Sequence, residues 1–218
     1  MSYPTRSLPW VLLPATCPCC GTRGAAPCDS CIAALRRTPA LPVPVALDSC
    51  GAFLAYEGPG RELVARMKYR NARAALGFLA AGMAALVDPA AIDVVTWAPT
   101  TRARRRARGF DQARLLARLV ARLLHRPCRP LLDRRAGPPQ TGRSRDARHL
   151  GPAYAARPGR ALGRVLLVDD VVTTGGTMTA GARALRAAGA TQVHGLAASR
   201  TPLKLRAVWS ERTSNGST

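Results

Sequence analysis

The sequence contains few aromatic residues, almost no lysine and no long apolar run. Phe, Trp and Tyr together make up 5% of the 218 residues, and only two of the 33 basic residues are lysine. No apolar stretch approaches the roughly 20 residues of a transmembrane helix, so we expect no membrane insertion. The first 16 residues contain only the short apolar piece Trp10-Val-Leu-Leu. Because this start lacks the long apolar region of a signal peptide, we expect a cytoplasmic protein.

Acidic residues are scarce as well, and the formal net charge is +21. The excess is concentrated in residues 102–160, which contain 17 arginines and three aspartates. Such a surface attracts phosphates, from pyrophosphate up to nucleic acid. A coding bias toward Ala and Arg is the alternative explanation, and the sequence leaves both open.

Hydrophobic residues nevertheless make up 47% of the chain, which is enough for a core. Strand-like runs alternate with helical periodicity, and this order predicts an α/β fold with a parallel sheet. We expect strands at 50–56, 92–97, 164–169 and 191–197. The expected helices cover 61–87 (interrupted near 69–71), 110–125 and 177–188. This organisation predicts a cysteine-rich module and connector at 10–44, a main domain at 45–205 and a tail at 206–218.

Two of the cysteine pairs have the spacing of a metal site. Cys17 and Cys20 form one Cys-x2-Cys pair, and Cys28 and Cys31 form another seven residues later. Four thiolates complete a closed tetrahedral Zn²⁺ site, and Gly21 permits a sharp reversal after the first pair. A redox pair and incidental thiols are the alternatives. Since a closed site leaves no open coordination position, we expect zinc here to be structural.

Residues 165–177 are the most informative segment. An apolar run predicts a strand that ends at two adjacent acids, Asp169 and Asp170, and the turn Thr173-Thr-Gly-Gly-Thr177 precedes a helical pattern. Ligands of parallel α/β sheets bind beyond the carboxyl ends of strands, where a Gly/Thr turn directs backbone N–H groups at phosphate. Two carboxylates beside that turn suit the hydroxyls and metal of a sugar phosphate. A helix-capping pair at the strand end is the alternative.

This segment resembles, at every position, the phosphoribosyl pyrophosphate (PRPP) motif of type I phosphoribosyltransferases. The whole chain is similar to the ComF/GntX family, which joins a zinc ribbon to such a domain. Further matching pieces, in family order, are residues 17–21, 28–31, 56–63, 67–69, 106–112 and 140–142. Asp111 departs from the Asn that is usual in the family. The resemblance implies a parallel-sheet type I phosphoribosyltransferase-like fold with a small N-terminal four-cysteine zinc ribbon.

The resemblance also implies roles for individual residues. Asp169 and Asp170, the catalytic pair, would bind the ribose hydroxyls directly or through Mg²⁺. The residues that would wrap the 5′-phosphate are Thr173, Thr174, Gly175, Gly176 and Thr177. The pyrophosphate loop would consist of Pro99, Thr100, Thr101 and Arg102. A mobile loop containing Gln140 and Arg148 would cover the reaction centre. Two alternatives stay open nearby: Arg102–Arg108 is an anion site or a solvated basic loop, and Trp97 stacks on a base or packs at its strand end.

The implied function is the transfer of ribose 5-phosphate from PRPP to an unknown acceptor. This phosphoribosyltransferase would act in DNA uptake during natural competence or in nucleotide-linked metabolism. The alternative is a non-catalytic competence factor that binds single-stranded DNA, contacts a competence helicase and uses PRPP as a regulatory ligand. A third alternative is an inactive scaffold that has kept its binding loop.

Overall fold

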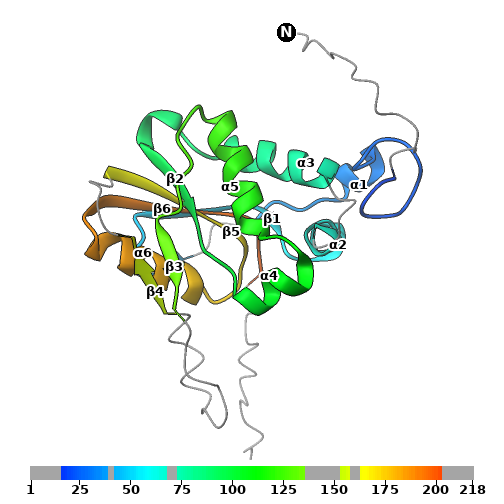
Figure 1. Cartoon of the computed structure of the whole chain (residues 1–218). Helices are drawn as coiled ribbons and strands as arrows, with labels where there is room; N and C mark the ends of the chain where they lie inside the picture. Colours follow the sequence, from blue (N-terminus) through cyan, green and yellow to red (C-terminus); the bar gives the residue numbers. More distant parts are fainter. Residues whose placement is uncertain (1–15, 39–41, 68–72, 136–152, 158–162, 203–218) are drawn as a thin grey trace, which may run out of the picture.

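The computed structural model describes residues 16–38, 42–67, 73–135, 153–157 and 163–202. Its central sheet contains four parallel strands (Figure 1). Their order across the sheet is β1 (Ser49–Ala55), β6 (Ala190–Arg200), β5 (Gly163–Val172) and β2 (Val94–Trp97). A separate antiparallel pair consists of β3 (Leu132–Arg134) and β4 (Tyr154–Ala156). The expected α/β class with a parallel sheet is confirmed.

The sheet is covered on both faces. Helices α2 (Gly58–Arg66), α3 (Arg73–Ala84) and α5 (Gln112–Leu123) pack on one face, and α6 (Gly176–Ala187) with β3 and β4 packs on the other (Figure 1). Within β5, residues 165–168 are all buried, because alternate side chains enter the two cores. Continuous apolar strands are typical of parallel sheets, and this explains the unbroken hydrophobic run that the sequence shows.

Helix α5 follows its predicted amphipathic pattern. Leu116 and Val120 are fully buried, whereas Arg114, Arg118 and Arg122 form an exposed stripe. Leu123, the last residue of the helix, is 49% exposed. Among the described residues, no helix combines the length and apolar character that crossing a membrane requires.

Short bridges cover both edges of the sheet. Arg37 pairs with Leu54 of β1 in an antiparallel bridge, and the carbonyl of Arg36 accepts the N–H of Ala55 at 2.9 Å. At the other edge, Cys128 pairs with Val95 of β2 in a parallel bridge. These contacts satisfy backbone groups that an open edge strand would leave unpaired.

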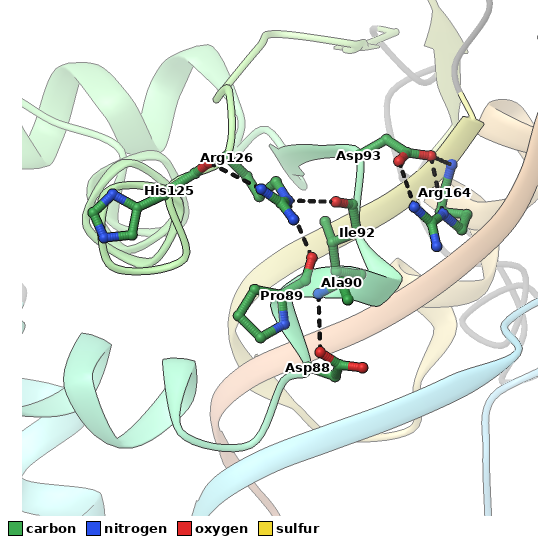
Figure 2. Close-up of polar contacts among 8 residues, drawn as sticks. All are labelled: Asp88, Pro89, Ala90, Ile92, Asp93, His125, Arg126 and Arg164. Atoms are coloured by element: carbon green, nitrogen blue, oxygen red, sulfur yellow. Dashed lines mark hydrogen bonds and ion pairs between the residues drawn. The ribbon is translucent and has the colours of Figure 1, made fainter.

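Polar contacts hold the amino ends of β2 and β5 together (Figure 2). The predicted site lies at the other end of these strands, where their carboxyl ends are. Arg164 donates from Nη2 to Oδ1 of Asp93 at 2.7 Å, and its backbone N–H donates to Oδ2 at 2.8 Å. Arg126 donates from Nε to the carbonyl of Ile92 at 2.7 Å and to that of Pro89 at 3.1 Å. The loop before β2 is therefore held by the side chains of Arg164 on β5 and of Arg126, which follows α5.

Candidate functional site

Asp169 and Asp170 lie near the carboxyl end of β5. The strand continues beyond them to Val172, further than the sequence predicted, because β6 pairs with it as far as Arg200. Oδ1 of each aspartate accepts the N–H of the following residue at 2.8 Å. Asp169 is buried, and this burial raises the pKa of its carboxyl; the charge of Asp170 raises it further. Two carboxylates crowded in this way favour a neighbouring cation or hydroxyl donors.

The predicted phosphate turn connects β5 to α6. Thr173 and Thr174 are exposed, and Gly175 adopts the left-handed conformation (φ +81°) as the N-cap residue of α6. The first N–H groups of α6 have no acceptor inside the helix, and the helix dipole places partial positive charge at the same end. A turn with this arrangement can bind a phosphate through main-chain donors. The helix ends as predicted, with Gly189 in the left-handed region (φ +93°).

The connector that follows the cysteine module passes behind this turn. A Cβ atom on Gly175 would lie 2.9 Å from Cγ of Pro44. The buried guanidinium of Arg200, at the carboxyl end of β6, donates from Nη2 to the carbonyl of Pro42 at 2.8 Å. Connector residues therefore contact both the phosphate turn and the neighbouring strand end. Sequence reasoning missed Arg200, whose partner lies 158 positions away along the chain.

The predicted pyrophosphate loop lies beside the end of β5. The N–H of Ala98 donates to the carbonyl of Val168 at 2.9 Å, which places the start of the loop next to Asp169. At the other end of the loop, Oγ1 of Thr101 accepts the N–H of Arg104 at 3.1 Å and caps α4 (Arg102–Arg108). The structure thus brings together, at one edge of the sheet, the loop at 99–102, the two acids and the turn at 173–177.

The basic run 102–108 forms a helix and not the loop that one alternative expected, although its described arginines are solvated as that alternative has it. Thr101 caps the start of α4, and Gly109 (φ +80°) ends it in the left-handed conformation. The exposed arginines of the helix include Arg102, Arg104, Arg105 and Arg106. Within the described part of the chain, none of these four forms an ion pair. Their charges therefore face solvent directly after the loop.

Asp111 connects the loop to helix α5. Its Oδ2 accepts the N–H of Thr100 at 3.1 Å, and its Oδ1 accepts the N–H of Arg114 at 3.3 Å as the N-cap of α5. The side chain is 9% exposed. Asp offers a separate acceptor oxygen to each of these two donors, whereas the single amide oxygen of Asn would have to accept both. Trp97 nearby packs against the core, with the Arg114 guanidinium 5.7 Å from its ring centroid.

Two further residues contact the loop, and sequence reasoning missed both. Tyr154 on β4 donates its hydroxyl to the carbonyl of Pro99 at 3.2 Å, and Nη1 of Arg134 on β3 lies 3.5 Å from the same oxygen. Neither residue belongs to a contiguous motif with the loop, so only their pairing across β3 and β4 could have indicated them. Gln140 and Arg148 of the predicted mobile loop lie outside the described residues.

The four cysteines of the N-terminal module converge as their spacing predicts. The sulfur atoms of Cys17, Cys20, Cys28 and Cys31 all lie within 4.8 Å of one another. The sulfurs of Cys20 and Cys28 are 3.7 Å apart. Zinc–sulfur bonds of about 2.3 Å in a tetrahedron separate sulfurs by about 3.8 Å, so the donor set and its spacing fit this ion. Gly21 has φ +81°, which confirms the predicted reversal.

Hydrogen bonding to sulfur also suits a metal. The N–H groups of Cys19 and Cys28 each donate to Sγ of Cys17 at 3.4 Å. Burial opposes ionisation of Cys17, but these backbone donors and that of Cys20 outweigh it and lower its pKa to about 5. Burial and hydrogen bonds from the same cluster raise the pKa of Cys31 instead. All four thiols could therefore be ionised together only with a cation between them.

Comparison with known proteins finds a matching family model. The family model of the phosphoribosyl transferase domain matches residues 114–203. The match runs from α5 to just beyond β6, and it includes both acids and the turn at 173–177. The chain is therefore an α/β protein in which residues 114–203 match a phosphoribosyl transferase domain, and four cysteines positioned to bind a metal ion precede that match. No curated protein matches the sequence.

Proposed function

We propose that this protein binds PRPP and transfers its ribose 5-phosphate to an acceptor, with release of pyrophosphate. One observation carries the proposal: an acidic pair and a Gly/Thr turn at a helix N-terminus share one sheet edge inside a matched phosphoribosyl transferase domain. The ribose and its 5′-phosphate need these two chemistries side by side. The acids offer acceptors for hydroxyls, and the turn offers main-chain donors for phosphate.

In this proposal, three groups of residues at the carboxyl ends of the strands each bind a different part of PRPP. Asp169 and Asp170 hold the ribose hydroxyls, and residues 173–177 bind the 5′-phosphate. The loop at 99–102 binds pyrophosphate, whose negative charge grows as the bond to the anomeric carbon breaks. Stabilising that charge and holding the ribose in line are the two main needs of such a transfer. Asp169 and Asp170 would hold Mg²⁺, and the ion would supply positive charge that neutralises part of the charge on the leaving group.

The four-cysteine cluster has a separate, structural role in this proposal. Zn²⁺ is the ion that four thiolates at this spacing bind most commonly, and the closed set leaves no position for a substrate. The resemblance to ComF/GntX proteins supports a role in DNA uptake or nucleotide-linked metabolism. In this organisation residues 10–44 form the zinc module and connector, and residues 45–205 form the transferase-like domain.

Calorimetry with PRPP and Mg²⁺ tests the proposed binding site. Asp170→Asn should weaken PRPP binding by roughly tenfold or more, since a charge-assisted hydrogen bond contributes about 1.5–3 kcal/mol. Asp88→Asn is the matched control: Asp88 caps Ala90 at the opposite edge of the sheet, and its replacement should leave the affinity unchanged. Equal affinities for Asp170→Asn and the wild type would contradict the proposal.

Catalysis needs its own test, because binding alone does not require transfer. We expect the protein to release labelled pyrophosphate from PRPP when the correct acceptor is present, and a panel of nucleobases with Mg²⁺ is the first screen. Release that disappears in Asp170→Asn would assign the activity to this site. PRPP binding without release for any acceptor would favour the regulatory-ligand alternative.

The exposed arginines favour one second candidate, a factor that binds single-stranded DNA and a competence helicase with PRPP as its regulator. Four arginines of α4 and the stripe Arg114, Arg118 and Arg122 on α5 supply the charge. Affinity for an oligonucleotide should then fall steeply with salt, because each phosphate contact releases counterions. A flat salt response would exclude this candidate.

A further inference from the structure

A single peptide group in the pyrophosphate loop is held from both sides. The carbonyl of Pro99 accepts the hydroxyl of Tyr154 at 3.2 Å. The N–H of Thr100, at the other end of the same peptide, donates to Oδ2 of Asp111 at 3.1 Å. Because a peptide group is planar, contacts at its oxygen and its nitrogen together determine the orientation of the whole plane.

The two residues on the carbonyl side form one unit. Arg134 and Tyr154 lie directly opposite each other in the β3–β4 register. Nη1 of Arg134 is 3.5 Å from both the Pro99 carbonyl and the Tyr154 hydroxyl, and the guanidinium carbon lies 5.8 Å from the Tyr154 ring centroid. The Tyr154 contact is the shorter of the two to Pro99, so Tyr154 makes the main hydrogen bond and Arg134 orients its ring. Burial raises the pKa of Tyr154, so the phenol keeps the proton that it donates.

The strand pair that carries this unit is anchored to the rest of the domain. The N–H of Leu131, just before β3, donates to Oγ1 of Thr96 on β2 at 3.2 Å in a buried position. Leu132 packs on α6, where a Cβ on Gly181 would lie 3.3 Å from its Cδ1. These contacts hold the β3–β4 pair in place, and with it the position of the Tyr154 hydroxyl next to Pro99.

We propose that Tyr154 is a positioning residue whose ring is oriented by Arg134. Its hydrogen bond holds the Pro99–Thr100 peptide in the orientation that binds the pyrophosphate portion of the substrate. This inference rests on the proposed function and extends it to two residues outside the PRPP motif. A loop that is already oriented loses less conformational entropy when its ligand binds, so removing the hydroxyl weakens affinity for that ligand portion alone.

The test compares three ligands with one conservative variant. Tyr154→Phe keeps the ring and removes only the hydroxyl, and calorimetry with Mg²⁺ would use PRPP, inorganic pyrophosphate and ribose 5-phosphate. We expect affinity for PRPP and pyrophosphate to fall by about three- to tenfold, the range of one neutral hydrogen bond. Ribose 5-phosphate binds at the acids and the turn, and its affinity should stay unchanged. Hydrogen exchange of the Thr100 amide should also become faster in the ligand-free variant.

Arg134→Gln is the second variant, and it should show the same selective loss. Arg157→Gln is the matched control, because Arg157 forms an exposed pair with Asp133 next to the same strands but has no contact with Pro99 among the described residues. A uniform loss for all three ligands, or no loss for any, would overturn the positioning role while leaving PRPP binding established. Failure of the wild type to bind any of the three would instead overturn the proposed function, and this inference with it.

Discussion

At the scale of single residues, Gly175 meets two requirements at once. Its φ of +81° lies in the left-handed region, and its missing Cβ leaves space for the ring of Pro44. Gly189 has a similar φ of +93°, but nothing lies within 4 Å of its Cβ position. Gly189→Ala should therefore lower the free energy of unfolding by about 1 kcal/mol, the usual effect of a Cβ in this conformation. Gly175→Ala should lower it further, as measured by urea denaturation.

A compensating change separates the two effects at Gly175. Pro44→Ala introduced together with Gly175→Ala should recover part of the lost stability, because the smaller side chain vacates the space that the new Cβ needs. Equal losses for Gly175→Ala and Gly189→Ala would show that the connector does not constrain the turn.

Residues of the site that stand in one contiguous motif could be predicted from the sequence. The apolar strand, the acids and the Gly/Thr turn occupy 13 consecutive positions, 165–177, so their arrangement depends on local geometry. Tyr154 and Pro99 lie 55 positions apart, and Arg200 and Pro42 lie 158 apart. Such contacts depend on how the elements pack, and no local pattern of residue types marks them.

At the scale of elements, α5 has a strong local sequence pattern and α4 has a weak one. Helix α5 was predicted because apolar residues recur along one face. Helix α4 has no apolar periodicity, since its sequence is Arg-Ala-Arg-Arg-Arg-Ala-Arg and residues 102–107 are exposed. Its two ends were nevertheless readable, because Thr101 is a typical N-cap and Gly109 a typical C-terminal residue. Capping residues without a hydrophobic face predict a helix less strongly than apolar periodicity does. The strands β3 and β4 are three residues long, and their sequences predict a strand more weakly still.

The cysteine module offers a prediction at this scale. The wild-type chain should retain about one Zn²⁺ after dialysis, and Cys28→Ser should lose it, because a tetrahedral site needs all four thiolates. Loss of the ion should also lower the temperature of thermal unfolding, since metal binding contributes directly to folding free energy. Metal analysis and thermal denaturation with and without a chelator are the measurements.

Cys128→Ser is the control for this experiment, because Cys128 lies beside β2 and outside the cluster. It should keep the wild-type metal content and the wild-type response to chelator. A Cys28→Ser variant that still bound one equivalent of zinc would contradict the proposed ligand set.

At the scale of the whole molecule, the edge of the sheet opposite the site should determine part of the acid stability. The side chain and backbone N–H of Arg164 hold the pKa of Asp93 down at about 2 (Figure 2). An unperturbed aspartate titrates near pH 3.9, so the folded state favours the ionised form. The stabilisation is therefore complete above about pH 4 and is lost as the pH falls toward 2.

Urea denaturation of the wild type and Asp93→Asn at several pH values measures this effect. The stability difference between them should be largest at pH 6 and should shrink as the pH is lowered to 3. In an Arg164→Gln background, Asp93→Asn should have a much smaller effect at every pH. A difference that stays constant between pH 6 and pH 3 would show that the pair does not titrate as described.

The position of the connector affects any chain that contains this domain without the segment before β1. A chain that began at β1 would expose the back of the phosphate turn to water and would leave the guanidinium of Arg200 without its carbonyl acceptor. Any protein that carries the same domain without the cysteine module must therefore supply another segment to fill that space, or tolerate a looser turn.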